Sequence, residues 1–222
     1  MSFSPSQSDP LRPADTHSDT RTGEPLGAAA RSRAETRRRL IEAGTECFAS
    51  HGLHGTTSTQ IARAAGVAAG TFYLHFADKQ ALFRAIAFDT LARLRDRMAS
   101  AADAAGGDVQ RQLRARMETL VAFAAEQRDL VRIVFGRGHE AGALAAEMAD
   151  ALFPGVETRL RDRIAEGLAD PGLHAAVAAQ SLLAMWTRVV AWWVEDPSRA
   201  SRDAVVETLV RMHPVHTHQR SR

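Results

Sequence analysis

The chain has 222 residues, of which 45% are apolar and 24% charged, a composition typical of a globular protein with a buried core. Its net charge of +2 is unevenly distributed, because residues 31–97 carry eleven basic and six acidic side chains while the flanking segments are slightly acidic. This basic segment favours a polyanionic partner such as nucleic acid or a membrane surface. Cys47 is the single cysteine, which excludes an intramolecular disulfide and is typical of a reducing cytoplasm.

Membrane association is disfavoured by the apolar pattern. The longest uncharged stretch, residues 171–187, is shorter than the roughly 20 apolar residues of a spanning helix. The N-terminus lacks the basic start and apolar stretch of a secretory signal. A basic helix on a membrane surface would need a free apolar face, and Leu40 to Phe48 fits a domain core better. We therefore expect no membrane partner.

The first helix is predicted over residues 33–51. Residues 1–32 are rich in polar residues, Pro and Gly and poor in large apolar side chains, so we expect a disordered tail. From residue 33 onward, one helical stripe contains Leu40, Gly44, Cys47 and Phe48. Gly52 is then a left-handed C-terminal stop.

Two short helices are predicted between Gly52 and Lys79. Thr57 or Ser58 caps the first, residues 66–68 form a turn, and residues 69–76 form the second. A close crossing of two such helices requires a small residue on the first and glycine at the turn, and Ala62 and Gly66 occupy these places. The spacing predicts a helix-turn-helix over residues 57–76.

The remaining chain also predicts helices and shows no alternating strand pattern. Asp78 caps a helix over residues 79–100, and Asp108 precedes another. Further helical segments are predicted at 130–135, 143–168 with a bend at Pro154, 173–195 and 198–212. The fold class is therefore all-α, with a frayed tail over residues 214–222.

The stretch FASHGLHGTTSTQIARAAGVAAGTFYLHFADKQALF, residues 48–83, resembles the DNA-binding domain of the TetR family of bacterial transcription regulators. The resemblance covers about residues 33–93. It implies an N-terminal three-helix domain with a helix-turn-helix, followed over residues 94–213 by a larger helical domain for ligand binding and dimerisation.

The resemblance also implies roles for individual residues in this DNA-binding domain. The second helix of the helix-turn-helix lies in the major groove, and residues at its edges hold phosphates. Thr57, Tyr73 and Lys79 would contact phosphates, and Arg33 would reach a phosphate or the minor groove. The family often has polar side chains where this chain has Ala68 and Ala69, so part of the specificity would come from DNA shape. Base contacts would fall to the surface formed by Ala68, Ala69, Gly70, Thr71, Leu74 and His75.

In the family, the last two helices pair with their copies in a homodimer. A helical face with Leu182, Trp186, Val189 and Trp193 offers such a surface, although filling the monomer core is the alternative. The family also implies a cavity for a small apolar or aromatic effector. Candidate lining residues are Met117, Phe123, Phe135, Met148, Phe153, Met185, Trp186 and Trp192, and the charged candidates are Arg132, Arg137, His139 and Arg188.

The resulting hypothesis is a ligand-responsive repressor that binds a palindromic operator on double-stranded DNA as a dimer. The alternative is a helical small-molecule-binding adaptor that has lost sequence-specific DNA binding. We expect no enzyme, cofactor or metal site. Cys47 and His51 are four residues apart, and both are expected on the apolar stripe of the first helix. A buried thiol beside a hydrogen-bonded histidine is therefore a better interpretation than a nucleophilic pair.

Overall fold

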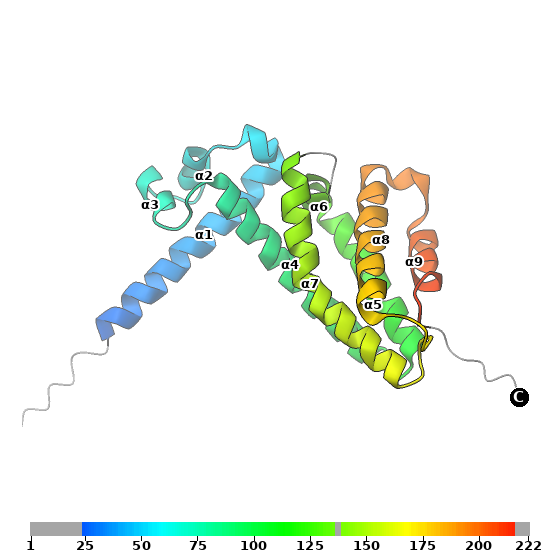
Figure 1. The fold of residues 1–222 in the computed structure, drawn as a ribbon. Helices are drawn as coiled ribbons and strands as arrows, with labels where there is room; N and C mark the ends of the chain where they lie inside the picture. The colour runs from blue at the N-terminus through cyan, green and yellow to red at the C-terminus, as the bar shows by residue number, and fades with distance from the viewer. Residues whose placement is uncertain (1–23, 136–138, 216–222) are drawn as a thin grey trace, which may run out of the picture. The chain divides into compact units, whose positions relative to one another are not determined.

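The computed structural model describes residues 24–135 and 139–215, which are almost entirely helical (Figure 1). The contacts divide the chain into two units, Met1–Arg38 and Arg39–Arg222. The elements in order are α1 Glu24–Gly55, α2 Ser58–Ala64, α3 Ala69–Tyr73, α4 Lys79–Ala104, α5 Val109–Glu126, α6 Arg128–Phe135, α7 His139–Ala165, α8 Ala175–Glu195, the short 3₁₀ helix η1 Pro197–Arg199 and α9 Arg202–Arg211. The all-α prediction is confirmed for the described residues.

Helix α1 begins at Glu24, nine residues before the predicted start. The expectation of a disordered tail up to residue 32 is therefore wrong for residues 24–32, while residues 1–23 lie outside the described part. A run of three alanines, residues 28–30, has high helix propensity that the average composition of the tail concealed. The predicted stop at Gly52 has the left-handed φ of 69°, and a further helical turn follows it.

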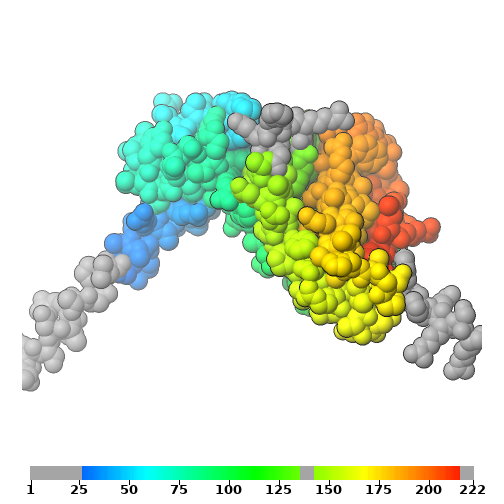
Figure 2. Space-filling model, viewed as in Figure 1, coloured from blue at the N-terminus to red at the C-terminus, as the bar shows by residue number. Residues whose placement is uncertain are grey.

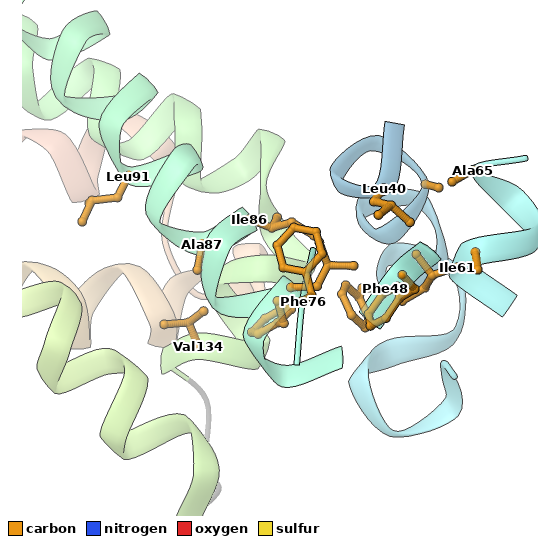
Figure 3. Packing of buried hydrophobic residues seen from close by; sticks show 14 of the residues in the cluster. Leu40, Phe48, Ile61, Ala65, Phe76, Ile86, Ala87, Leu91 and Val134 are labelled. Atoms are coloured by element: carbon orange, nitrogen blue, oxygen red, sulfur yellow. The ribbon is translucent and has the colours of Figure 1, made fainter. Parts of the chain in front are cut away.

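The C-terminal half of α1 packs with α2, α3 and α4 around one apolar cluster. Leu40, Ile61, Phe72 and Leu82 are completely buried there. Figure 3 shows residues from α1 and α2 at one end of this cluster and Leu91 and Val134 at the other. The burial of these side chains provides the main stabilisation of the short helices, which are too short to be stable alone.

Helix α4 joins this N-terminal core to the helices that follow. Phe83 and Ile86 belong to the same cluster as Val134 of α6 and Met148 of α7. Arg84 of α4 also forms an ion pair with Glu147 of α7. The boundary expected at residues 93 and 94 is therefore not a break in packing, because it falls within a continuous helix that contributes to the cores on both sides.

The remaining helices share two further clusters. Helices α5, α8 and α9 contribute to one, with Leu113, Trp193 and Leu209 buried, and α7 and α8 form the other around Leu160 and Leu182. Figure 2 shows the surfaces of α7 and α8 meeting. By length and composition alone α8 could cross a membrane, but one face of it packs in these two clusters, through residues such as Leu182, Val190 and Trp193.

The end of the described chain is packed, which corrects the expectation of a frayed tail from residue 214. Val215 is buried and forms an isolated antiparallel bridge with Ala169. Its carbonyl accepts a hydrogen bond from the Gln110 side chain at 2.9 Å. Residues 216–222 lie outside the described part.

Candidate nucleic-acid interface and cavity

Helix α2 begins with a reciprocal cap between Thr57 and Gln60. The Gln60 backbone N–H donates to Thr57 Oγ1 at 3.2 Å, and the Thr57 backbone N–H donates to Gln60 Oε1 at 2.8 Å. This capping box satisfies two backbone donors that a helix start leaves unpaired. The prediction that Thr57 starts the helix is confirmed, and its predicted phosphate contact would use a hydroxyl that already serves the cap.

The turn between α2 and α3 is held by Gly66 and Arg39. Gly66 has a φ of 66°, which favours glycine. The Arg39 guanidinium donates to the carbonyl oxygens of Ala65 and Gly66, the latter at 3.2 Å. A Cβ at residue 66 would lie 2.7 Å from Arg39 Nη2. Arg39 therefore fixes the helix-turn-helix from within.

Helix α3 presents one face to solvent and one to the core. Phe72 is fully buried, whereas Tyr73 is 58% and Leu74 71% exposed. Residues 68–70 are also exposed, and Thr71 and His75 are half-buried. The helix ends at Tyr73, so the predicted end at residue 76 is wrong, because the chain turns to bury Phe76. The base-reading candidates thus lie on one short segment.

Gly70 lies on this segment and has no steric reason within the protein to be glycine. Its backbone is helical, and an added Cβ would find no atom within 4 Å. Glycine in a helix is less stable than alanine by about 0.5–1 kcal/mol. A glycine with open space around it is consistent with close approach of another molecule to the backbone.

Lys79 has a structural role that the sequence did not predict. Its Nζ donates to the carbonyl oxygens of Leu53, His54 and Thr56 at 2.8, 3.3 and 2.8 Å. These three acceptors use all three N–H groups of the ammonium. Lys79 therefore joins the end of α1 to the start of α4, and it can add charge, but no further hydrogen bond, to a phosphate contact.

The described arginines of the first unit lie on exposed positions of α1. Arg33 is exposed, and Arg38 forms an ion pair with Glu35 at 2.6 Å. The contact of Arg33 with DNA stays a prediction.

A cavity of about 300 Å³ lies among helices α4 to α8. Its wall is mainly apolar and includes four of the predicted residues, Phe123, Phe135, Met148 and Trp186. Met117 lines a smaller adjacent cavity of about 80 Å³. Phe153, Met185 and Trp192 lie outside both walls: the first two pack in the clusters around α8, and Trp192 lies beneath the Arg199 guanidinium.

The charged groups of the cavity are not those predicted. Arg95, Arg116 and Arg159 line it, together with Asp96, whereas Arg132 and Arg188 are exposed on other faces. The side chains of Arg137 and His139 lie outside the described part. Sequence reasoning missed the three arginines because they come from three helices, and only tertiary packing brings them together.

The predicted dimer face of α8 is largely buried within the protomer. Leu182 and Trp193 are in the core, and Trp186 lines the cavity. These residues therefore fill the core of the protomer, which was the alternative interpretation of this face. The opposite side of α8 is exposed at helical spacing and comprises Val177, Ser181, Ala184, Arg188 and Trp192.

The pair of Cys47 and His51 does not form a reactive site. His51 is exposed, contrary to the expectation that both lie on the apolar stripe, and its Nδ1 lies 3.2 Å from the Cys47 backbone oxygen. Burial, and secondarily the Glu46 charge, raises the pKa of the Cys47 thiol, which disfavours the nucleophilic thiolate.

Comparisons with known proteins agree with this geometry. The family model described as bacterial regulatory proteins, tetR family, matches residues 40–86. The uncharacterized HTH-type transcriptional regulator YdgC of Bacillus subtilis is 30% identical over 130 residues, which are 57% of this chain and 67% of YdgC. The HTH-type transcriptional repressor AcnR of Corynebacterium efficiens is 37% identical over 59 residues, 27% of this chain and 31% of AcnR.

A solved structure extends the similarity of fold to the other helices. The transcriptional regulator FadR from Bacillus subtilis, in complex with stearoyl-CoA, matches with a TM-score of 0.66 and 20% sequence identity. The match covers 81% of this chain and 99% of that one. At this identity the match shows a shared fold.

Proposed function

Since this chain belongs to the TetR family of bacterial transcription regulators, we propose that it is a ligand-responsive repressor that binds a palindromic operator as a dimer. Membership makes it a helix-turn-helix DNA-binding regulator and not an enzyme. The sign of regulation is proposed by analogy with the repressor AcnR. A regulator of this kind works in the cytoplasm of a bacterium, where its DNA is.

The observation that carries the DNA-binding proposal is the two-sided character of α3. Tyr73 and Leu74 project to solvent while Phe72 anchors the same helix turn in the core. A recognition helix must be held rigidly by one face and present the other to the major groove. We assign base contacts to residues 68–71, Leu74 and His75, and phosphate contacts to Arg33, Thr57 and Tyr73, with Lys79 contributing charge.

A dimer is required because two recognition helices must reach half-sites about 34–36 Å apart. The proposed surface is the outer stripe of α8, from Val177 to Trp192, together with the exposed side of α9. Val177 is 64% and Met212 61% exposed, and large apolar side chains of this kind mark a contact surface. Figure 2 shows part of the α8 surface uncovered in the protomer.

Ligand response is proposed to pass through α4. Leu91 of α4 and Val134 of α6 line the cavity and also belong to the core that supports the helix-turn-helix. A ligand that prefers one packing of these residues shifts the population between conformations that fit DNA well and poorly. FadR, of similar fold, was solved with stearoyl-CoA, which supports a ligand site among these helices.

Selection from a pool of random DNA duplexes tests the proposal. We expect enrichment of a two-fold symmetric sequence by the full chain, and its loss when Leu74 is replaced by Asp, which places a negative charge in the groove. Leu74 is exposed, so Leu74→Asp should fold normally, and circular dichroism checks this. Absence of an enriched sequence would support the adaptor alternative.

A further inference from the structure

Three arginines from three helices line the cavity at one place. Arg95 of α4, Arg116 of α5 and Arg159 of α7 are in the wall of the 300 Å³ cavity. Arg116 and Arg159 are also in the wall of the adjacent 80 Å³ cavity, which adds Arg163. The two walls share Arg116, Arg159 and Trp186, so these residues lie where the cavities meet.

The charges of Arg95, Arg116 and Arg159 are not neutralised within the described part of the protein. None of the three guanidiniums has a hydrogen bond or ion pair there, whereas other arginines are paired, as Arg97 is with Glu126 and Arg163 with Glu166. Asp96 is a carboxylate in the same wall, and Asp103 acts on Arg116 only at longer range. The wall therefore carries an excess of positive charge in largely apolar surroundings.

The surroundings of Arg116 and Arg159 disfavour the charged form of each guanidinium. Burial lowers the pKa of Arg116, with Arg163 adding to the effect. Burial also lowers the pKa of Arg159, followed by the charges of Arg116 and Arg95. By surface area Arg95 and Arg159 are exposed and Arg116 is half-buried, so the three guanidiniums lie in the part of the cavity wall that solvent also reaches. Unpaired guanidiniums that converge on a mainly apolar cavity are typical of a binding site.

Trp186 supplies a second, independent sign of a missing partner. Its Nε1 is completely buried and has no hydrogen-bond acceptor among the described residues. The ring stacks on His213 with 6.0 Å between centroids and lines both cavities. An indole N–H normally finds an acceptor when buried, so a small shift of this ring on ligand binding would let an acceptor atom of the ligand satisfy it.

We propose that the cavity binds a small amphipathic anion, whose carboxylate or phosphate group is held by Arg116 and Arg159 and whose apolar body packs against Phe123, Met148 and Trp186. Planar guanidiniums bind both kinds of anion through paired hydrogen bonds. The 300 Å³ cavity is at the lower end of the range of about 300–1,000 Å³ for small-molecule sites, so it suits a small ligand. The inference specifies the ligand class for the proposed function and rests on it for its regulatory meaning.

Binding of matched anionic and neutral compounds tests the charge requirement. Octanoate, octyl phosphate and octan-1-ol share an apolar body of suitable size, as do 4-phenylbutanoate and 4-phenylbutan-1-ol. Calorimetric titration of the full chain without DNA should show at least one anion binding about tenfold or more tightly than its alcohol, because a charge-assisted hydrogen bond is gained. Comparison of octanoate with octyl phosphate identifies the preferred anionic group.

Two variants locate the anionic group. Arg116→Gln and Arg159→Gln should each weaken anion binding about tenfold and leave the weaker binding of the alcohol unchanged. Arg111→Gln is the matched control, because Arg111 is exposed on α5 and outside both walls. Equal loss of anion and alcohol binding would indicate a structural role and overturn the inference. Failure of every anion to bind better than its alcohol would also overturn it.

The anion-binding experiment and the DNA-selection experiment can fail separately. An anion that binds a chain unable to select DNA would support the cavity assignment and overturn the repressor. Selection of an operator, with release by octan-1-ol as effective as release by octanoate, would support the repressor and overturn the anion site.

Discussion

At the scale of single residues, the helix-turn-helix is held by two cations that donate to backbone carbonyls. Arg39 binds the carbonyls of the turn, and Lys79 binds those at the end of α1. Both belong to the basic segment that suggests a polyanionic partner. Because both side chains bind backbone carbonyls, the number of basic residues in the segment does not show how many of them are available to bind DNA.

Lys79→Met is expected to lower the free energy of unfolding by about 1–3 kcal/mol, because three carbonyls lose a charged donor. Affinity for all DNA sequences should fall together with stability. Thermal unfolding and operator titration of the same sample measure both, and Gln80→Ala, at an exposed neighbouring position, is the control. Lost affinity with unchanged stability would instead make Lys79 a phosphate ligand alone.

Gly70→Ala is expected to change stability and DNA binding in opposite directions. The methyl group meets no atom of the protein, so the helix gains about 0.5–1 kcal/mol. If the DNA backbone or bases approach Gly70 closely, the same methyl group costs about tenfold in operator affinity. Denaturant unfolding and operator titration test the two effects, and unchanged affinity would remove Gly70 from the interface.

At the scale of the elements, the order and helical nature of the segments were predictable from the sequence, but faces and ends were not. Gly66 and the Thr57 cap are local signals, and both were located correctly. The early start of α1 and the burial of Val215 depend on context beyond a short window. The face of α8 was assigned incorrectly because an apolar stripe indicates burial but not whether the partner is the same chain or a copy.

The sequence predicted some of the residues that line the cavity, but it could not predict which residues tertiary packing brings together there. Aromatic and Met side chains in the C-terminal helices identify a pool of residues, and four of the eight line the main cavity. The arginines could not be identified, because their spacing along three separate helices contains no signal of convergence. Their relation appears only when α4, α5 and α7 pack together.

Arg159→Gln is expected to stabilise the ligand-free protein. Burial and the charges of Arg116 and Arg95 lower the pKa of Arg159, which means that its charged form is disfavoured in the folded state. Removing the charge relieves the repulsion by Arg116 and Arg95, and we expect a small increase in Tm. Arg111→Gln should leave Tm unchanged in the same thermal scan. A decrease for Arg159→Gln would contradict a mutually repelling cluster.

At the scale of the whole molecule, function requires two copies and a route from the cavity to α3. The cluster that contains Leu91 and Val134 is the proposed route, because both residues also line the cavity. The outer stripe of α8 provides the proposed contact between copies, which places Arg188 of each protomer in or near the interface. In this proposal, DNA binding, dimerisation and ligand binding use different surfaces, and mutations should separate them.

Ala184→Arg is expected to weaken the dimer at least about tenfold, because it introduces a bulky charge beside Arg188 in the outer stripe. Analytical ultracentrifugation measures the dissociation constant. Ala125→Arg, at an exposed position of α5, should leave it unchanged. Equal behaviour of the two variants would place the dimer contact elsewhere.

The central claim, that this chain is a dimeric operator-binding regulator, is tested most directly by titrating the selected duplex at two salt concentrations while measuring the mass of the complex. Contacts with several phosphates predict that affinity falls steeply as salt rises, because counterions are released from the duplex. Two protomers on one two-fold symmetric duplex, with this salt dependence, are the expected result. Weak binding that is insensitive to sequence, or one protomer bound to an asymmetric site, would contradict the account.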